Sequence, residues 1–209
     1  MPTSDPTTWT DLKATLANWL ARDDLSTTEI PEAIALFERR AQRVIFSPER
    51  EATVALVLDA EAVALPADHW GIRALHIDAD PKTVLEPMTL AELRNAFAAA
   101  ATGRPQNYAV RGEELVLGPA PDASYTGRLT YIQAIPALGA AQATNWLLND
   151  HPDAYVHGAL AELHLLLGDE VRAAIHERVL QRIVAEIDAS ATRRSAGGAP
   201  IRLRSPVRV

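Results

Sequence analysis

Histidine is the residue type in this chain that first suggests metal binding or acid–base chemistry, and the sequence contains six. His157 and His164 lie seven residues apart, which in a helix is two turns, or about 10.5 Å along the axis. Zinc holds each imidazole nitrogen at ~2.1 Å, so this pair cannot share one ion unless a third element rearranges it. His176 precedes Glu177 but lacks the second histidine of a metalloprotease helix. We therefore interpret these histidines as packing or surface residues and predict no metal and no cofactor.

Other patterns that carry chemistry are weak or missing. The sequence has no Gly-x-Ser-x-Gly elbow, no phosphate-binding loop and no dinucleotide fingerprint. It has no cysteine, which excludes disulfides, thiolate metal sites and a cysteine nucleophile. Four aspartates lie at predicted turns, where Asp commonly caps and bends a chain: Asp23, Asp24, Asp78 and Asp80. We predict that the protein is not an enzyme, and keep a hydrolase with an unrecognised His/Asp site as an alternative.

Charge is distributed unevenly along the chain. The net charge is −7, yet residues 1–192 carry 15 basic and 27 acidic groups, which gives −12. Such an acidic body repels a polyphosphate and argues against broad DNA binding. One basic cluster ends a predicted helix, and it consists of Arg39, Arg40 and Arg43, with Arg50 beyond. Complementarity to the helix C-terminus explains this cluster more simply than contact with nucleic acid does. A DNA-binding regulatory protein that uses the Arg39–Arg50 region remains the alternative function.

The end of the chain has the pattern of a docking segment. After Ser195–Pro200, which is rich in small residues, apolar and polar side chains alternate to the end of the sequence. Such a segment can add a strand to the sheet edge of another protein, although simple disorder is common at termini. The candidate docking residues are Ile201, Arg202, Leu203, Arg204, Val207, Arg208 and Val209.

Hydrophobic periodicity predicts helices at both ends of the chain and strands between them. Helical spacing occurs over about 8–21, 28–46, 152–167 and 169–192, with Thr8 and Asp169 as caps. Period-two patterns predict strands at 53–58, 63–65, 72–77, 108–110, 115–117 and 125–131, and a capping box at Thr89–Glu92 opens a short helix to about 100. No apolar run approaches the ~20 residues of a membrane span, and the first residues lack the order of a signal peptide, which predicts a soluble protein.

These elements predict an α+β protein that is mainly α. Its N- and C-terminal helical hairpins would form a four-helix bundle, with a small antiparallel β region and one short helix inserted, and an extended C-terminal arm. The predicted domains are a helical bundle from residues 1–48 and 145–192, an inserted β-rich region at 49–144 and a flexible C-terminal arm at 193–209.

The order of several segments resembles the head-to-tail adaptor (connector) proteins of tailed bacteriophages and of phage-like gene transfer agents. The motifs are turns and helix caps, and their order and spacing carry the resemblance over most of residues 8–192. The matching stretches are Ile30–Arg43, Leu65–Trp70, Gly103–Tyr108, Leu117–Asp122, Asn145–Leu148 and Pro152–Leu160, together with Tyr125 and Tyr131.

The resemblance implies a structural virion protein of the neck, made in the host cytoplasm, without a cofactor. Adaptors of this kind form a ring, typically of twelve subunits, beneath the portal, where they extend the DNA channel and give the tail a platform. The implied partners are the portal protein, a downstream tail or stopper protein and further copies of the chain. DNA would pass through the channel without specific binding, no membrane would be involved, and the C-terminal arm would grip the portal.

Overall fold

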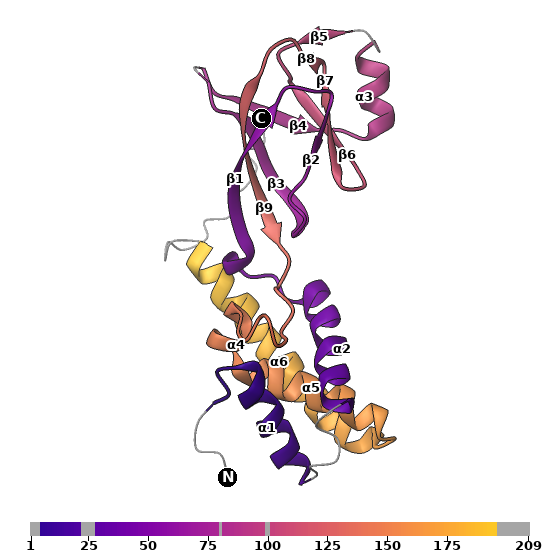
Figure 1. Ribbon diagram of the computed structural model, residues 1–209, viewed down its shortest axis with the longest axis vertical. Helices are drawn as coiled ribbons and strands as arrows, with labels where there is room; N and C mark the ends of the chain where they lie inside the picture. Colours follow the sequence, from indigo (N-terminus) through magenta and orange to yellow (C-terminus); the bar gives the residue numbers. More distant parts are fainter. Residues whose placement is uncertain (1–4, 22–27, 80, 99–100, 196–209) are drawn as a thin grey trace, which may run out of the picture. The chain divides into compact units, whose positions relative to one another are not determined.

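The structure is a computed structural model that describes residues 5–21, 28–79, 81–98 and 101–195 (Figure 1). Contacts within the chain divide it into two compact units. The helical unit comprises the described residues within Met1–Glu49 and Ile135–Val209, and the sheet unit comprises those within Arg50–Ala134. The division into domains at 1–48 with 145–192, 49–144 and 193–209 stays a prediction.

The helical unit contains five α-helices whose ends follow local sequence signals. Thr8 accepts a hydrogen bond from the backbone N–H of Asp11 and so caps the helix that begins at Trp9, and Asn145 caps the helix that begins at Trp146 in the same way through Leu148. Pro152 occupies the first turn of the next helix, where its missing N–H is not needed. The helices are α1 (Trp9–Leu20), α2 (Glu29–Val44), α4 (Trp146–Asp150), α5 (Pro152–Leu166) and α6 (Glu170–Ser195). No described helix combines the length and apolar character needed to cross a membrane.

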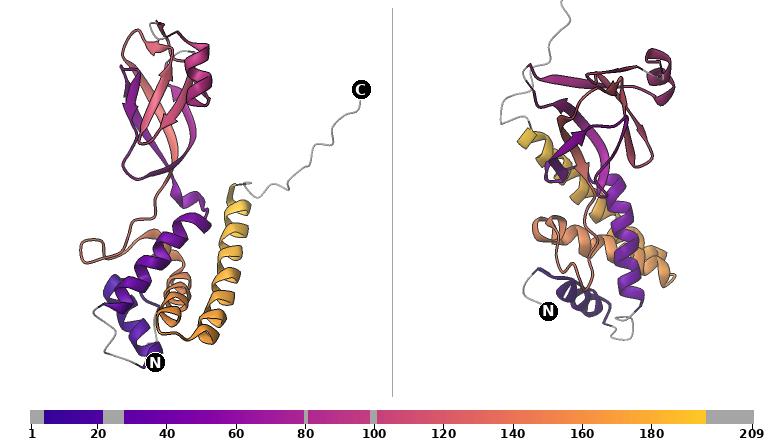
Figure 2. Two further views of the ribbon diagram at one scale, coloured as in Figure 1. Left: turned by 90° about the vertical axis from the view of Figure 1, so that its right-hand side faces the viewer. Right: turned by 45° about the horizontal axis from the view of Figure 1, so that its top comes forward.

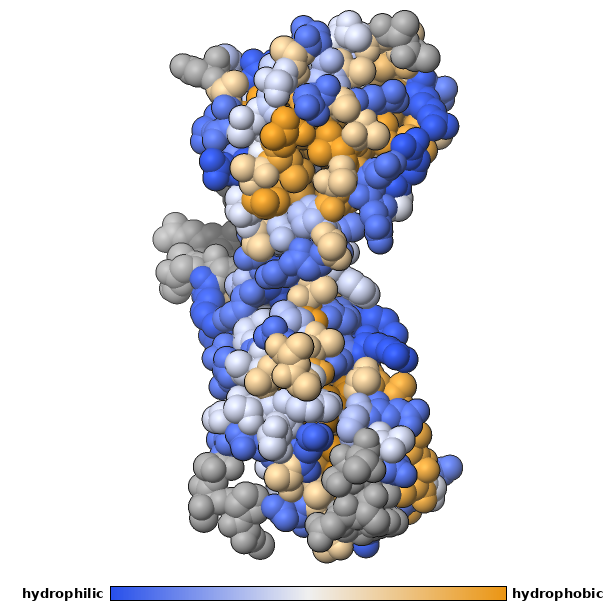
Figure 3. Space-filling view, viewed as in Figure 1, coloured by the Kyte–Doolittle hydropathy of each residue, from blue (hydrophilic) through white to orange (hydrophobic). Residues whose placement is uncertain are grey.

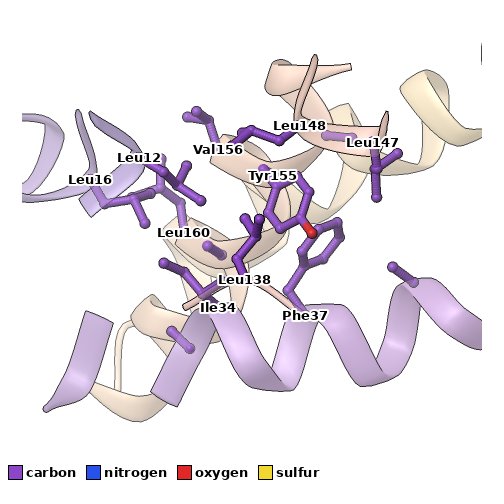
Figure 4. Packing of buried hydrophobic residues seen from close by; sticks show 14 of the residues in the cluster. Leu12, Leu16, Ile34, Phe37, Leu138, Leu147, Leu148, Tyr155, Val156 and Leu160 are labelled. Carbon is purple, nitrogen blue, oxygen red and sulfur yellow. The ribbon is translucent and has the colours of Figure 1, made fainter. Parts of the chain in front are cut away.

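Helix α5 lies at the centre of the helical unit and contacts α1, α2 and α6 (Figure 2). It is buried around most of its circumference, as expected for a helix with apolar residues on every side. Phe37 of α2 packs edge-on against Tyr155, with ring centroids 5.2 Å apart, and Leu12 and Leu16 of α1 reach the same cluster (Figure 4). Gly158 lies directly under the Phe37 ring, so a side chain at position 158 would overlap it.

The sheet unit is built on a seven-stranded sheet. Its strand order is β1-β9-β3-β4-β6-β7-β2, and two short strands, β5 (Thr102–Gly103) and β8 (Ala120–Pro121), pair separately. A 3₁₀ turn, η1 (Pro48–Arg50), precedes the first strand. The seven strands are β1 (Glu51–Leu58), β2 (Ala62–Ala64), β3 (His69–Ile77), β4 (Thr83–Pro87), β6 (Asn107–Arg111), β7 (Glu114–Gly118) and β9 (Tyr125–Gln133).

Two features of the connections explain how this sheet curls. The strands at the two ends of the order, β1 and β2, are joined by only three residues, 59–61, so the ends of the sheet must approach each other. The sheet is therefore nearly closed (Figure 1). Strands β4 and β6 run parallel, and helix α3 (Leu90–Ala96) lies in the crossover that a parallel pair requires. The other pairs in the seven-stranded sheet are antiparallel.

The sheet unit has an apolar interior and a smaller cluster on its outer side. Alternation along β6 and β7 places Tyr108, Leu115 and Leu117 in the interior, while Ala109 and Val116 face α3. The capping box predicted at Thr89 and Glu92 is present at the start of α3.

The prediction of a mainly helical four-helix bundle is wrong. The protein is a mixed α/β structure that has a seven-stranded, nearly closed sheet in addition to its helices. The β region was expected to be small because β4, β5 and β8 gave no clear signal in the sequence. The helical unit also differs from the expected pairing of two hairpins, because the other long helices pack around a central α5.

Candidate functional site

The predicted docking residues of the C-terminal arm lie outside the described part of the chain, which ends at residue 195. They are Ile201, Arg202, Leu203, Arg204, Val207, Arg208 and Val209. Their role in docking therefore stays a prediction.

The arginines considered for nucleic acid do not form one exposed basic patch. Arg40 of α2 is half-buried and pairs with Glu162 of α5, at 3.5 Å, and with Glu177 of α6. Arg50 is 1% exposed, donates from Nε to the carbonyl of Gln133 at 2.9 Å and has its guanidinium 6.0 Å from the Trp70 ring centroid. The structure brings Arg40 into the packing of three helices and places Arg50 in the sheet unit, which disfavours the DNA-binding alternative.

The other two arginines of the α2 cluster and the one described turn aspartate, Asp78, are exposed surface charges. Arg39 and Arg43 are exposed on α2. Asp78 accepts a hydrogen bond from Arg128 at 2.8 Å, and this bond, with Lys82 nearby, holds the pKa of Asp78 below its ordinary value. Asp23, Asp24 and Asp80 lie outside the described residues.

A buried polar network ties the segment that enters α4 to the helical core. Oε1 of Glu38 accepts hydrogen bonds from the backbone N–H of Leu138, at 2.8 Å, and from the hydroxyl of Tyr155, at 3.1 Å. Nδ2 of Asn145 donates to the Tyr155 hydroxyl at 2.6 Å and to the carbonyl of Pro136 at 2.7 Å. Burial raises the pKa of Glu38 and also raises the pKa of Tyr155. The network positions the chain and has no exposed reactive group.

Three histidines meet where α5 packs on α6. The Nδ1 atoms of His157 and His176 are 2.9 Å apart, and the rings of His164 and His176 stack with centroids 5.4 Å apart and an angle of 6°. Trp19 of α1 packs edge-on against His157, with centroids 5.7 Å apart. His164 is 5% exposed, and His157 and His176 are half-buried. We call His157, His164 and His176 the histidine cluster.

Burial is the main electrostatic influence on the histidine cluster. It lowers the pKa of each member, and for His176 the two neighbouring imidazoles lower it further, to about 4. Among the described residues, no group of three or more His, Asp or Glu side chains has the arrangement needed to hold a metal ion. The cluster is therefore a group of closely packed, mostly neutral imidazoles.

The meeting of these histidines was not predicted from the sequence, because spacing along one helix does not show it and His176 comes from the next helix. A signal was available, because residues symmetric about the α5–α6 turn face each other in an antiparallel helix pair. His157 and His176 are symmetric about residues 166–167, at this turn.

The turn between α5 and α6 also exposes a group of large apolar side chains, visible at the lower right of Figure 3. We call this group the apolar corner: Leu165, Leu166, Leu167, Val171 and Ile175. Its members are between 38% and 75% exposed. Scattered apolar residues are normal on a surface, whereas these five lie within a span of eleven residues.

Among the described residues, the polar clusters around Glu38 and His176 are packed between helices, whereas the apolar corner is exposed. A model of the SU10 adaptor protein family matches residues 7–204, nearly the whole sequence. The chain belongs to this family of phage-related structural adaptors, which confirms the adaptor resemblance at the level of the family. A comparison with curated proteins gives no match.

Proposed function

We propose that the protein is a head-to-tail adaptor that forms a ring beneath the portal of a tailed phage or a phage-like gene transfer agent. The ring would extend the DNA channel and offer a platform to a tail or stopper protein. Family membership over residues 7–204 is the observation that carries this proposal. The expected location is the neck of the virion, reached from the host cytoplasm during assembly.

The charge of the chain supports a channel through which DNA passes without specific binding. Residues 1–192 have a net charge of −12, which disfavours adhesion of phosphates. Two of the four arginines that could have formed a DNA-binding surface are engaged within the protein. We therefore expect weak binding to duplex DNA at physiological salt, without a sequence preference. Tight binding with a steep salt dependence in a mobility-shift assay would instead support the regulatory alternative.

Arms on a ring can hold a portal through many weak contacts made together. We propose that Ile201, Leu203, Val207 and Val209 supply apolar contacts of an added strand, and that Arg202, Arg204 and Arg208 meet acidic groups of the portal. Because every subunit of the ring contributes one arm, loss of the arm should remove binding to the portal while leaving the folded units intact.

Deletion of Pro200–Val209 tests this role of the arm. We expect the truncated chain to unfold at the same temperature as the full chain but to stay in the supernatant when DNA-filled capsids with exposed portals are sedimented. A second variant, with Ile201→Ser and Leu203→Ser, keeps the length and the arginines of the arm. We expect it to lose most of the binding to the portal too, because its apolar contacts are removed. Normal completion of capsids by the truncated chain would contradict the arm hypothesis.

The ring itself is tested by mass. We expect isolated full-length chain to give a low-order species by native mass spectrometry and to add to portal particles as a defined multiple, twelve in the typical ring. An irregular or single-copy stoichiometry on the portal would contradict the ring. Because it uses the full-length chain, this measurement does not depend on the outcome of the arm deletion.

A further inference from the structure

The histidine cluster joins two helices through a contact that can hold only a limited number of protons. The Nδ1 atoms of His157, on α5, and His176, on α6, face each other at 2.9 Å. A hydrogen bond at this distance needs one nitrogen to donate and the other to accept. If both imidazoles were protonated, two N–H groups would point at each other, and the bond would be replaced by repulsion of like charges.

His164 extends this constraint along α5. Its ring stacks on His176 at 5.4 Å, nearly parallel, so a charge on either ring lies close to the other. His164 is also 5% exposed, and water is therefore poorly placed to screen that charge. The cluster thus tolerates few protons because of its geometry, in addition to its burial.

We propose that the histidine cluster is a proton-sensitive clasp that holds α5 on α6 near neutral pH and releases the two helices on mild acidification. The clasp lies on both sides of the α5–α6 turn, since His164 directly precedes Leu165 and His176 directly follows Ile175. Leu165 and Ile175 belong to the apolar corner, so release would also change the shape of that corner. The inference does not depend on the proposed role beneath a portal.

The charges around the cluster do not cancel the repulsion. Asp153 near His157 and Asp169 near His164 favour protonation, but they are opposed by Arg182 and Arg172, respectively. Burial outweighs these pairs and lowers the pKa of both histidines.

Within the described part of the chain, the other packed elements add no carboxylate that is free of an ion pair at this place. From α2, Arg40 reaches towards α5 and α6 and pairs there with Glu162 and Glu177, so both carboxylates are engaged in ion pairs. From α1, the cluster receives the uncharged ring of Trp19. Neither contribution supplies a carboxylate that would hold a second proton in the cluster.

The direction of the pH effect follows from proton linkage. The pKa values of the three imidazoles in the folded protein lie below the ordinary value of 6.5, that of His176 at about 4. The unfolded chain therefore binds more protons than the folded unit between these values, and stability falls as the pH falls from about 7 towards 4. The contribution of the neutral histidine cluster to stability is fully present at pH values well above the ordinary imidazole pKa of 6.5.

Hydrogen exchange of the full chain at pH 7.5 and pH 5.0 tests the clasp. After correction for intrinsic exchange rates, we expect protection of the amides in α5 and α6 near the cluster to fall by about tenfold or more at pH 5.0, with little change in the sheet unit. In His176→Asn, whose side-chain amide can replace Nδ1 without titrating, this loss should be clearly smaller than in the wild type, because only His157 and His164 still titrate. His151→Asn, at a half-buried histidine outside the cluster, is the control and should behave like the wild type.

Three results would overturn the proposal. The first is unchanged protection of α5 and α6 in the wild type at pH 5.0, and the second is an equal loss in His176→Asn. The third is a rise in protection when Zn²⁺ alone is added to the wild type at pH 7.5 but not to His176→Asn, because it would assign the imidazoles to a metal. If His176→Asn does not fold, NMR titration of the wild-type imidazoles decides, and independent titration of His157 and His176 near pH 6.5 would contradict the clasp.

Discussion

The two units of this protein reach a stable interior by different means. In the helical unit, α5 is surrounded by other helices, and its fit depends on a few closely matched points such as Gly158 under Phe37. Polar groups are buried there as well, including Glu38, Asn145 and His164. In the sheet unit, most buried side chains are apolar, although Arg50 and Asn107 are also buried, and strand pairing spreads the stabilising contacts over many residues.

This difference teaches where each unit is sensitive. A helix that packs on several sides has little freedom to move when one contact changes, and a buried polar group loses its partner without replacement by water. A curled sheet with exposed edges can adjust a side chain at its surface. We therefore expect matched substitutions to cost more in the helical unit than in the sheet unit.

The largest effect is expected for Gly158→Ala. The added Cβ would overlap the Phe37 ring, which is fully buried and held against Tyr155. Overpacking of this kind costs about 3 kcal/mol at the upper end, which exceeds the ~1 kcal/mol that alanine gains over glycine in a helix. Hydrogen exchange in increasing urea should show this loss in the helical unit alone.

The matched change in the sheet unit is Gly118→Ala. Its Cβ would meet Leu93 at 2.6 Å and Phe97 at 2.7 Å, but Phe97 is half-exposed and can turn away. We expect a loss of about 1 kcal/mol there. Gly139→Ala, in the helical unit with no atom within 4 Å of its Cβ, should change stability by less than about 0.5 kcal/mol. An equal loss of stability for Gly158→Ala and Gly118→Ala would contradict the expected difference in sensitivity between the two units.

Much of the local structure was predictable because it depends on neighbouring residues. The caps at Thr8 and Thr89 and the turn at Gly112, which has a φ of +61°, follow from local hydrogen bonding and backbone freedom, and they occur where the sequence indicates them. The extent of the sheet was not predictable in this way. Irregular pairing between β3 and β9 interrupts the period-two pattern near Gly71, and β4 has only five residues.

The packing of α5 shows a second limit of sequence reasoning. Val156, Leu160, Leu163 and Leu167 recur at helical spacing, which predicts one buried face. Leu167 is nevertheless 38% exposed, whereas Ala159 and Ala161 on other faces are buried. Alanine occurs both inside and outside proteins, so periodicity alone did not show that α5 is surrounded. The meeting of His157 with His176 was missed for a related reason, because it depends on the register between two helices.

A smaller difference is expected from removing one hydroxyl in each unit. Tyr155→Phe removes the donor to Glu38 and the acceptor of Asn145 in a site without exposure, and should cost about 2 kcal/mol. Tyr131→Phe removes a hydrogen bond to Asp68, at 3.1 Å, but Asp68 is half-exposed and can bind water instead. Its cost should be about 0.5–1 kcal/mol, measured in the same exchange experiment. A larger cost at Tyr131 would reverse the proposed order of the two units.

The smallest effect concerns the sign of the pH dependence. Burial raises the pKa of Glu38 above its ordinary 4.5, so its contribution is present at low pH and is lost as the pH rises through the folded-state value. The hydrogen bond from Arg128 lowers the pKa of Asp78 below 3.8, so its contribution is present above 3.8 and is lost as the pH falls.

Glu38→Gln should therefore raise the stability of the helical unit more at pH 7 than at pH 4. Asp78→Asn should lower the stability of the sheet unit at pH 7 and leave that stability unchanged well below the folded-state pKa of Asp78. Both should be compared in the His176→Asn background, because the histidine cluster acts in the opposite direction to Glu38. The measurement is exchange protection of each unit across this pH range. If the two substitutions changed the pH dependence of stability in the same direction, Glu38 would be stabilised as an anion. The buried network would then hold a charge, whereas its geometry indicates a protonated, desolvated acid.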